Sequence, residues 1–318
     1  MKAVYVIVCT KPLQWFNALN IDFPGQEDRI LIVVNSFKDA VIFYNRVKEY
    51  DATWSDVIFG QTREDSYALV KQLASQYTIE RLYVDCDYGS IGGAYAKLPV
   101  SNLYVIEEGL GPYVDKVKKG TPKRLIFKLK GWGAFLGGNS HTKGIYLYNH
   151  SYYRHVHKGY KKEILSFRTD FFSALAARRE LLEKVAGLEL PAGVQGGKKV
   201  AFYLTAYSIN PDVIKFLTEN IDQFDNIIIK IHPHLANNFR IEDHTDKIPA
   251  EKLTVMSNSV LAEIIISRLA EGNELTVVHE SSTTCLYVDE NSMKVINMGK
   301  VLQEEFGTFR KMYLENFA

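Results

Sequence analysis

The stretch NLYVIEEG, at residues 102–109, is a short apolar run that ends in two glutamates and a glycine. Runs of this length that are rich in Tyr, Val and Ile are typical of buried β-strands. Similar runs lie upstream at 3–10, 29–35 and 81–87, and segments with apolar residues at helical spacing lie between them. Strand–helix alternation of this kind predicts a parallel sheet with helices on both faces.

The same alternation returns in the last third of the chain. The runs expected to form strands there lie at 199–207, 226–234, 252–257, 274–282 and 293–299. Helical patterns at 210–221 and 259–272 accompany these runs. The second half of the chain is therefore expected to form a sheet of its own.

The two halves are separated by a region in which the alternation is lost. Residues 114–170 are basic, aromatic and irregular, a helix is expected near 169–186, and the Gly/Pro-containing stretch 187–199 is typical of a linker. We therefore predict an α/β protein with two Rossmann-like domains that face each other across a cleft. Their expected ranges are 1–190 and 191–318, with the final helix allowed to pack back on the first domain.

The composition excludes several classes of protein. The chain has 318 residues, of which 47% are hydrophobic and 24% are charged, and its formal net charge of +1 gives no sign of nucleic-acid binding. The 3 cysteines lack the spacing of a metal site. No cleavage-site pattern follows the first apolar run, and no stretch reaches the ~18 apolar residues that span a bilayer. We expect a cytoplasmic protein in a reducing compartment.

Polar residues follow four of the expected strands. CTKPLQWFN begins at residue 9 and EEG at 107 in the first half, and KIHPH begins at 230 and HESSTT at 279 in the second. Ligands of open parallel sheets bind beyond the carboxyl ends of the strands, so these residues are the candidate site. The adjacent charges of Glu107 and Glu108 should raise the pKa of one carboxyl toward a value that suits a general base.

These motifs resemble bacterial sialyltransferases. EEG at 107–109, KIHP at 230–233 and SSTT at 281–284 are similar, in this order, to motifs of glycosyltransferase family 52, whose relatives include the bacterial polysialyltransferases. The opening CTKPLQWFNAL also looks like the first strand and loop of that family. The resemblance implies the GT-B architecture. It also implies an inverting transfer of sialic acid from CMP-Neu5Ac to a galactoside-type acceptor of capsule or lipooligosaccharide, through an α2,3 linkage.

The resemblance also implies catalytic roles. Glu108 would be the general base that takes the proton of the acceptor hydroxyl, and Glu107 would position it or share its charge. Gly109 would let the backbone turn so that the carboxylate points into the cleft. His232 would bind the phosphate of the leaving CMP. The hydroxyls and backbone amides of three residues would hold the other phosphate oxygens. These residues are Ser281, Ser282 and Thr283.

Further substrate contacts are implied at Lys230, which matches a position that contacts the cytosine, and at Pro233, Ser259, Thr10, Gln14 and Gly109. Ser259 lies at a helix start, with Glu263 one turn inside, but the acidic residue that holds the ribose in some relatives has no clear match. His234 stands where relatives often carry Arg or Lys, and Lys11 is an addition in the first loop. No cofactor and no metal ion are expected.

Three other interpretations stay open at this point. His232 and His234, together with His244 and His279, could form a zinc site. A GT-B enzyme that uses CMP-Kdo, or a polysialyltransferase, would need the same phosphate chemistry. A nucleotide-binding protein without catalysis is the third alternative, although such a protein would need no base opposite a phosphate site. GWGAFLGG at 131–138 has G-x-G spacing but follows no strand, so dinucleotide binding is not expected.

The segment KVKKGTPKRLIFKLK, at 116–130, carries seven Lys or Arg residues and no acid. It is interpreted as a solvated loop, as a surface for an anionic acceptor, or as a contact with an anionic membrane. The last interpretation would place the protein at the inner face of the plasma membrane, where lipid-linked acceptors are carried. No nucleic-acid partner is expected.

Overall fold

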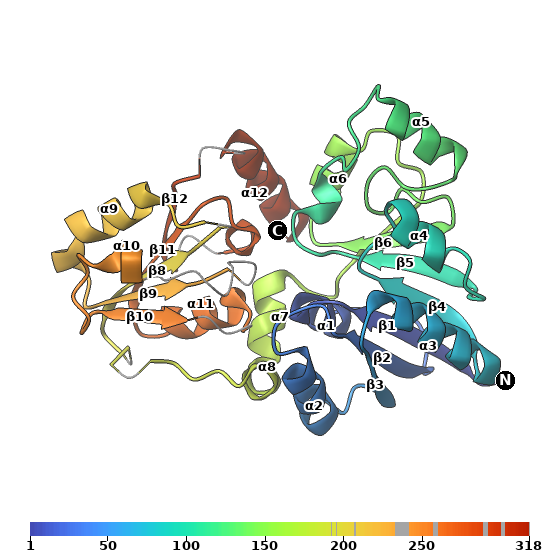
Figure 1. Cartoon of the computed structure of the whole chain (residues 1–318), viewed down its shortest axis with the longest axis horizontal. Helices are drawn as coiled ribbons and strands as arrows, with labels where there is room; N and C mark the ends of the chain where they lie inside the picture. Colours follow the sequence, from blue (N-terminus) through green and yellow to red (C-terminus); the bar gives the residue numbers. More distant parts are fainter. Residues whose placement is uncertain are drawn as a thin grey trace. The chain divides into compact units, whose positions relative to one another are not determined.

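The computed structural model describes residues 1–191, 193–194, 196–206, 208–232, 242–256, 260–288, 292–299 and 303–317. The chain folds into two compact units. The first unit comprises Met1–Ala174 and Met312–Ala318, and the second comprises Leu175–Lys311. Each unit is built around one parallel sheet (Figure 1). The prediction of an α/β chain with two Rossmann-like units is therefore confirmed.

The first unit contains a sheet of seven strands in the order β3-β2-β1-β4-β5-β6-β7. In chain order the strands are β1 (Ala3–Cys9), β2 (Asp28–Val34), β3 (Asp56–Gly60), β4 (Thr78–Val84), β5 (Asn102–Ile106), β6 (Thr142–Leu147) and β7 (Glu163–Ser166). All neighbouring pairs are parallel. The strand order reverses between β1 and β4, where an open α/β sheet forms its ligand-binding crevice.

Helices and one short 3₁₀ turn connect these strands. They are α1 (Pro12–Leu19), α2 (Ala40–Tyr50), α3 (Arg63–Gln76), α4 (Gly89–Tyr95), η1 (Gly111–Tyr113), α5 (Pro122–Leu129) and α6 (His150–Val156). Helix α7 (Phe171–Ala177) follows the last strand. The start of α3 shows how the sequence sets a boundary. The Thr62 hydroxyl accepts the Asp65 N–H at 3.1 Å and the Asp65 carboxylate accepts the Thr62 N–H at 2.9 Å, which is a capping box.

The interpretation of residues 114–170 as irregular is wrong, because α5, β6, α6 and β7 lie within them. Strand β6 has only a short apolar run after Thr142, Lys143 and Gly144, and β7 has four residues, so neither shows the long apolar pattern of β1 or β2. Strand β3, DVIFG, has only five residues and also lacks a long apolar pattern. Pairing with neighbouring strands, rather than the local sequence, determines these three strands.

The first unit is held together in part by aromatic residues that bond buried polar groups. The indole N–H groups of Trp15 and Trp54 both donate to the Asp51 carboxylate, at 2.8 and 2.6 Å. All three residues are buried. Asp51 caps the end of α2, so this arrangement ties α1 and the loop before β3 to one carboxylate.

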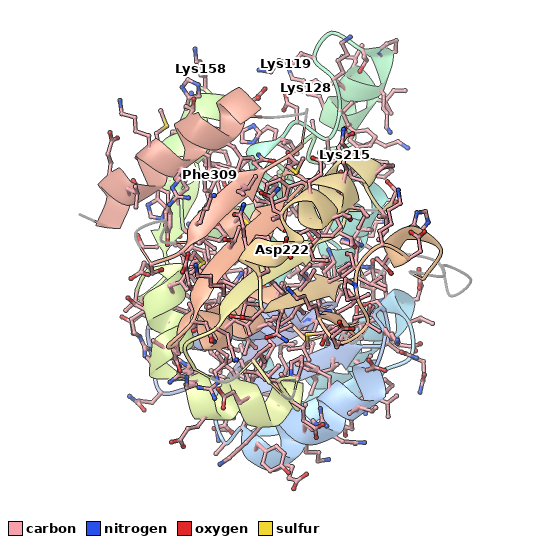
Figure 2. All side chains as sticks on the ribbon, turned by 90° about the vertical axis from the view of Figure 1, so that its left-hand side faces the viewer. Lys119, Lys128, Lys158, Lys215, Asp222 and Phe309 are labelled. Atoms are coloured by element: carbon pink, nitrogen blue, oxygen red, sulfur yellow. The ribbon has the colours of Figure 1, made fainter. Side chains whose placement is uncertain are left out.

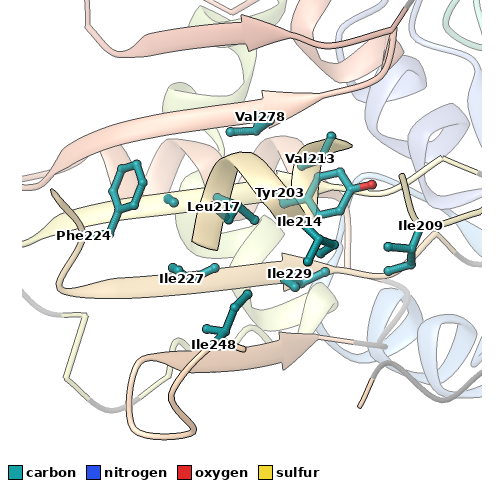
Figure 3. Close-up of a cluster of buried hydrophobic side chains, with 11 residues drawn as sticks. Tyr203, Ile209, Val213, Ile214, Leu217, Phe224, Ile227, Ile229, Ile248 and Val278 are labelled. Carbon is teal, nitrogen blue, oxygen red and sulfur yellow. The ribbon is translucent and has the colours of Figure 1, made fainter. Parts of the chain in front are cut away.

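The second unit contains a five-stranded parallel sheet in the order β10-β9-β8-β11-β12. Its elements are α8 (Arg179–Ala186), β8 (Lys199–Leu204), α9 (Pro211–Glu219), η2 (Ile221–Gln223), β9 (Asn226–Lys230), α10 (Glu242–Thr245), β10 (Leu253–Met256), α11 (Ala262–Ala270), β11 (Glu274–His279), η3 (Thr283–Leu286), β12 (Lys294–Asn297) and α12 (Gln303–Phe317). The strand order reverses between β8 and β11. Figure 3 shows α9 packing on this sheet, with Val213 and Leu217 against Ile227 and Val278.

The predicted boundary after residue 190 falls inside the second unit, because α8 belongs to that unit. Glu183 of α8 forms an ion pair with Arg268 of α11 at 2.9 Å. The last turns of α12, from Met312 on, belong to the first unit. There Asn316 donates to Asn149 at 3.1 Å and the Tyr313 hydroxyl accepts the Phe171 N–H at 3.2 Å.

Among the described residues, no helix is both long and apolar enough to cross a membrane.

Candidate active site

At the switch point of the first sheet, a buried carboxylate joins the ends of β1 and β4. Asp85 follows β4 and accepts both Nη groups of Arg63, at 2.8 and 2.7 Å, and the Thr10 hydroxyl, at 2.7 Å. Bidentate pairing with a guanidinium offsets the cost of burying the carboxylate. Since both oxygens of Asp85 accept these bonds, we assign it a structural role. No pattern in the sequence singles out Asp85 or Arg63.

The first loop is fixed by a glutamine that is fully buried. Oε1 of Gln14 accepts the N–H groups of Thr10 and Lys11, at 2.6 and 2.8 Å, and so caps the start of α1. Its Nε2 has no hydrogen-bond partner within the described residues. Substrate binding by Thr10 and Gln14 stays a prediction, and the amide donor of Gln14 is the group that could serve it.

Glu108 lies beyond the end of β5 and is the candidate base. Its side chain is 17% exposed, and Oε2 lies 3.3 Å from Lys11 Nζ. Burial raises the pKa of the Glu108 carboxyl, the Lys11 ammonium opposes this shift, and the Asp85 carboxylate adds to it. The sequence also predicted a raised pKa for one of the two adjacent glutamates. The cause differs from the expected charge of Glu107, because the shift comes from burial and from a carboxylate that follows another strand.

Two glycines allow the Glu108 side chain to take this position. Gly109 has φ of +79°, a left-handed conformation that glycine adopts without strain. At Gly111, a Cβ atom would lie 2.7 Å from Oε1 of Glu108. The turn after β5 therefore needs glycine once for its backbone and once for the space beside the carboxylate.

Glu107 faces a different environment from its neighbour. It is 1% exposed, and its Oε2 accepts the Tyr113 hydroxyl at 2.5 Å and the Tyr148 N–H at 2.7 Å. Its backbone carbonyl accepts Asn17 Nδ2 at 2.9 Å. These bonds join β5, β6, η1 and α1 at one edge of the sheet. Glu107 thus supports the turn that carries Glu108, and its carboxylate is too enclosed to meet a substrate.

In the second unit, three polar residues gather in a buried cluster. Lys230 ends β9 and is 5% exposed, and Glu263, in α11, is 6% exposed. The Thr284 hydroxyl donates to Glu263 Oε1 at 3.0 Å. Burial raises the pKa of the Glu263 carboxyl, while the positive charge of Lys230 opposes the shift. Glu263 is therefore a buried acidic residue near the end of β9, and no sequence motif assigns it a role.

His232 follows Lys230, and its backbone N–H donates to the Thr205 hydroxyl at 2.8 Å. Thr205 follows β8, so the ends of β8 and β9 are bonded to each other. Pro233, His234 and Ser259 lie outside the described residues. The predicted contacts of Pro233 and Ser259 stay predictions. Within the described part of the chain, no three His, Cys, Asp or Glu residues gather as metal ligands.

The turn after β11 uses its own side chains to fix two backbone amides. The Ser281 N–H donates to Asn297 Oδ1 at 3.1 Å, and the Ser282 N–H donates to His279 Nδ1 at 3.0 Å. Ser281 has φ of +57°, which is uncommon for a residue other than glycine. The expectation that these two amides hold a phosphate meets a competing arrangement, because both donate within the protein. The candidate phosphate ligands that remain are therefore the Thr283 amide and the hydroxyls of Ser281, Ser282 and Thr283.

Glu280 stabilises the loop that connects β8 to α9. It accepts the Tyr203 hydroxyl at 2.7 Å and Asn210 Nδ2 at 3.1 Å. The Asn210 side chain also caps α9 by accepting the Asp212 N–H at 2.9 Å. Glu280 thus connects the ends of β8 and β11 to the start of α9. No sequence signal points to this role.

Because His279 is buried, the stability of the second unit should depend on pH. The imidazole is 1% exposed, and burial lowers its pKa to about 4. The unfolded chain takes up this proton near pH 6.5. The stabilisation that comes from the neutral His279 imidazole is therefore complete above that pH. As the pH falls toward 4, the free energy of unfolding decreases by about 3 kcal/mol. His279→Asn, which keeps an acceptor near Nδ1, should flatten this slope in denaturant titrations followed by circular dichroism. An unchanged slope would contradict the assignment.

The chain resembles known proteins in structure, and no match was found by sequence. No protein-family model matches the chain, and no curated protein matches it. One similar solved structure is a UDP-GlcNAc 2-epimerase from Neisseria meningitidis bound to UDP-GlcNAc, with a TM-score of 0.52 and 11% identity. That match covers 98% of this chain and 94% of the other.

Two further structures share the fold. A UDP-GlcNAc 2-epimerase from Methanocaldococcus jannaschii in complex with UDP-GlcNAc and UDP has a TM-score of 0.55 and 11% identity, over 99% of this chain and 92% of the other. The wall teichoic acid polymerase TagF has a TM-score of 0.50 and 11% identity, over 98% of this chain and 79% of the other. At this identity the likeness shows the GT-B type of fold.

Proposed function

We propose that the protein is an inverting GT-B glycosyltransferase that uses a nucleotide-activated sugar, with Glu108 as its general base. The observation that carries this proposal is a mostly buried carboxyl with a raised pKa, set beyond the end of β5 by two glycines. The acceptor hydroxyl oxygen forms the new bond to the anomeric carbon, and its proton passes to Glu108. The bond from that carbon to the donor phosphate breaks, and the nucleotide leaves with its electron pair.

We propose CMP-Neu5Ac as the donor and the second unit as its binding site. The resemblance of KIHP and SSTT to bacterial sialyltransferases supports this donor, and the side chains of Lys230 and Glu263 would supply polar groups for a nucleoside. His232 and the hydroxyls of Ser281, Ser282 and Thr283 would stabilise the leaving phosphate. UDP-GlcNAc and CDPG are named as ligands of proteins with this fold, which supports a sugar-nucleotide donor in general.

The acceptor is proposed to be a galactoside of capsule or lipooligosaccharide, joined through an α2,3 linkage. Such acceptors are carried on lipids at the cytoplasmic face. The protein would therefore act in the cytoplasm and contact the anionic inner membrane through 116–130. The basic character of this segment supports that contact. No metal is assigned a role, because the proposed phosphate ligands are an imidazole and hydroxyls.

Incubation with CMP-Neu5Ac and lactose tests the proposal, with mass spectrometry as the readout. We expect a product heavier than lactose by one sialyl residue, and turnover that EDTA leaves unchanged. His232→Ala should abolish the product. Glu64→Ala, at an exposed position of α3, provides a control for the effect of substitution itself. Transfer from CMP-Kdo alone would replace the donor assignment, and failure with every nucleotide sugar tried would overturn the proposed reaction.

A further inference from the structure

Helix α5 presents large apolar side chains to solvent. Leu125, Ile126 and Leu129 are 60%, 50% and 79% exposed, and they are three of the nine exposed large apolar residues of the described chain. Their spacing of one and four positions places them on one side of the helix. Phe127, on the other side, is buried against Trp132, with ring centroids 5.4 Å apart. The helix is therefore packed in place with its apolar face outward, a pattern that marks an interaction surface.

A groove of about 780 Å³ continues this face. Its lining includes Leu125, Trp132 and Phe135, together with the basic Arg124 and Lys128. Lys130 lies over the ring of Trp132, at 4.5 Å from the centroid. An apolar surface with a rim of cations is the form that peripheral proteins present to the boundary between headgroups and acyl chains.

A basic pocket of about 270 Å³ adjoins the groove and shares Arg124 and Phe135 with it. Its other cations come from two separate parts of the chain. They are Lys119, Lys158, Lys161 and Lys162. Figure 2 shows Lys119, Lys128 and Lys158 toward the same end of the first unit. The turn after α6 thus adds positive charge that the basic segment 116–130 does not contain.

The charges of this pocket are not balanced within the protein. Asp115 is its only acidic lining residue, and it already pairs with Arg124 at 3.2 Å and lies 3.8 Å from Lys119. Lys162 donates to the carbonyl of Asn139. Within the described residues, Lys158 and Lys161 form no ion pair, and both are exposed. Two ammonium groups therefore remain for an anion the size of a phosphate.

The loop between the groove and the pocket is held firmly. Asp87 is fully buried and accepts the N–H groups of Gly137 and Asn139, at 2.8 and 3.1 Å, and the Thr142 hydroxyl, at 2.6 Å. Phe135 stacks on His157, with centroids 4.0 Å apart. The apolar face and the cationic pocket are thus two parts of one preformed surface.

We infer that this surface docks on a bilayer of anionic phospholipid, with Leu125, Ile126 and Leu129 in the acyl boundary and a headgroup phosphate in the pocket of Lys158 and Lys161. The inference rests on the membrane contact in the proposed function and goes beyond it, because it requires apolar insertion and a pocket outside 116–130. A second copy of the chain is disfavoured as occupant, since two cationic surfaces of the same kind would repel each other.

Co-sedimentation with vesicles tests the inference, using phosphatidylcholine alone or mixed with phosphatidylglycerol. We expect binding to the mixed vesicles only, and a fraction that stays bound at high salt, because inserted side chains are not screened as charges are. Leu125→Ser with Leu129→Ser should lower the partition coefficient by about tenfold or more and remove the salt-resistant fraction. The matched control is Val41→Ser with Ile42→Ser, since these α2 residues are 51% and 50% exposed.

The pocket is tested separately by Lys158→Gln with Lys161→Gln, against Lys38→Gln with Lys71→Gln at other positions. Only the first pair should weaken binding to the mixed vesicles. The inference would be overturned if the leucine and lysine variants both bound vesicles as well as the wild type does. Absence of binding by the wild type at low salt would also overturn it. So would self-association that the leucine variant abolishes, or tight binding of inorganic phosphate in the pocket without any effect on vesicles. Turnover on soluble lactose should be unchanged in all four variants, which separates this result from a failure of the proposed reaction.

Discussion

Glu108→Gln is expected to lower turnover with CMP-Neu5Ac by ~10²–10⁴ while CMP affinity stays nearly unchanged. The amide cannot take the proton of the acceptor hydroxyl, and the nucleotide is proposed to bind in the other unit. Steady-state kinetics and calorimetric titration with CMP would measure the two effects. Full activity, or loss of CMP binding together with activity, would contradict the role of Glu108 as the base.

The pH profile should identify the same group. Burial raises the pKa of Glu108, so the acid limb of kcat/KM should lie above the ordinary glutamate value of about 4.5. The base is ionised only above this limb, so activity should fall as the pH decreases through it. Lys11→Met removes the charge that opposes the shift and should move the limb to higher pH. A limb that does not respond to Lys11 would assign it to another group.

Glu107→Ala is expected to lower the free energy of unfolding of the first unit by roughly 2–5 kcal/mol, because it leaves two buried donors without their acceptor. These donors are the Tyr113 hydroxyl and the Tyr148 N–H. The midpoint of thermal unfolding should fall by roughly 5–15 °C, as measured by calorimetry. The two adjacent glutamates should therefore differ in phenotype, one in stability and the other in chemistry.

Glu107→Gln provides the matched variant. It retains one carbonyl oxygen that can accept both donors, and it should be much less destabilising than Glu107→Ala. Protein that remains folded after this change should keep its acid limb, since the pKa of Glu108 is shifted by burial and by the charges of Lys11, Asp85 and Lys116. Equal stability of Glu107→Ala and the wild type would show that the two bonds contribute little.

The sequence predicted the parts of the fold that depend on local pattern. The runs at 3–10 and 29–35 correspond to β1 and β2, and the described part of the run at 226–234 contains β9. Such runs are apolar because strands of parallel sheets are buried on both faces. Strands β6 and β7 were not predicted, because they contain few apolar residues. Their position in the sheet is determined by pairing of β6 with β5 and of β7 with β6.

The placement of Glu108 and His232 beyond strand ends was predictable from the sequence, because polar residues there follow apolar runs. The distinction between Glu107 and Glu108 was not, because it depends on Tyr113 and Tyr148, which come from other parts of the chain. For the same reason, the sequence did not predict that Lys230 and Glu263 lie close together. Adjacent residues in sequence can face different environments, and only the surrounding bonds reveal which one meets solvent.

The indoles that share Asp51 have a practical consequence for folding experiments. The chain has 3 tryptophans, at positions 15, 54 and 132, and all belong to the first unit. Intrinsic indole fluorescence therefore reports on the first unit, and the second unit unfolds without a tryptophan signal of its own. Tyr287→Trp, at a position buried against Phe309, would give the second unit its own optical probe.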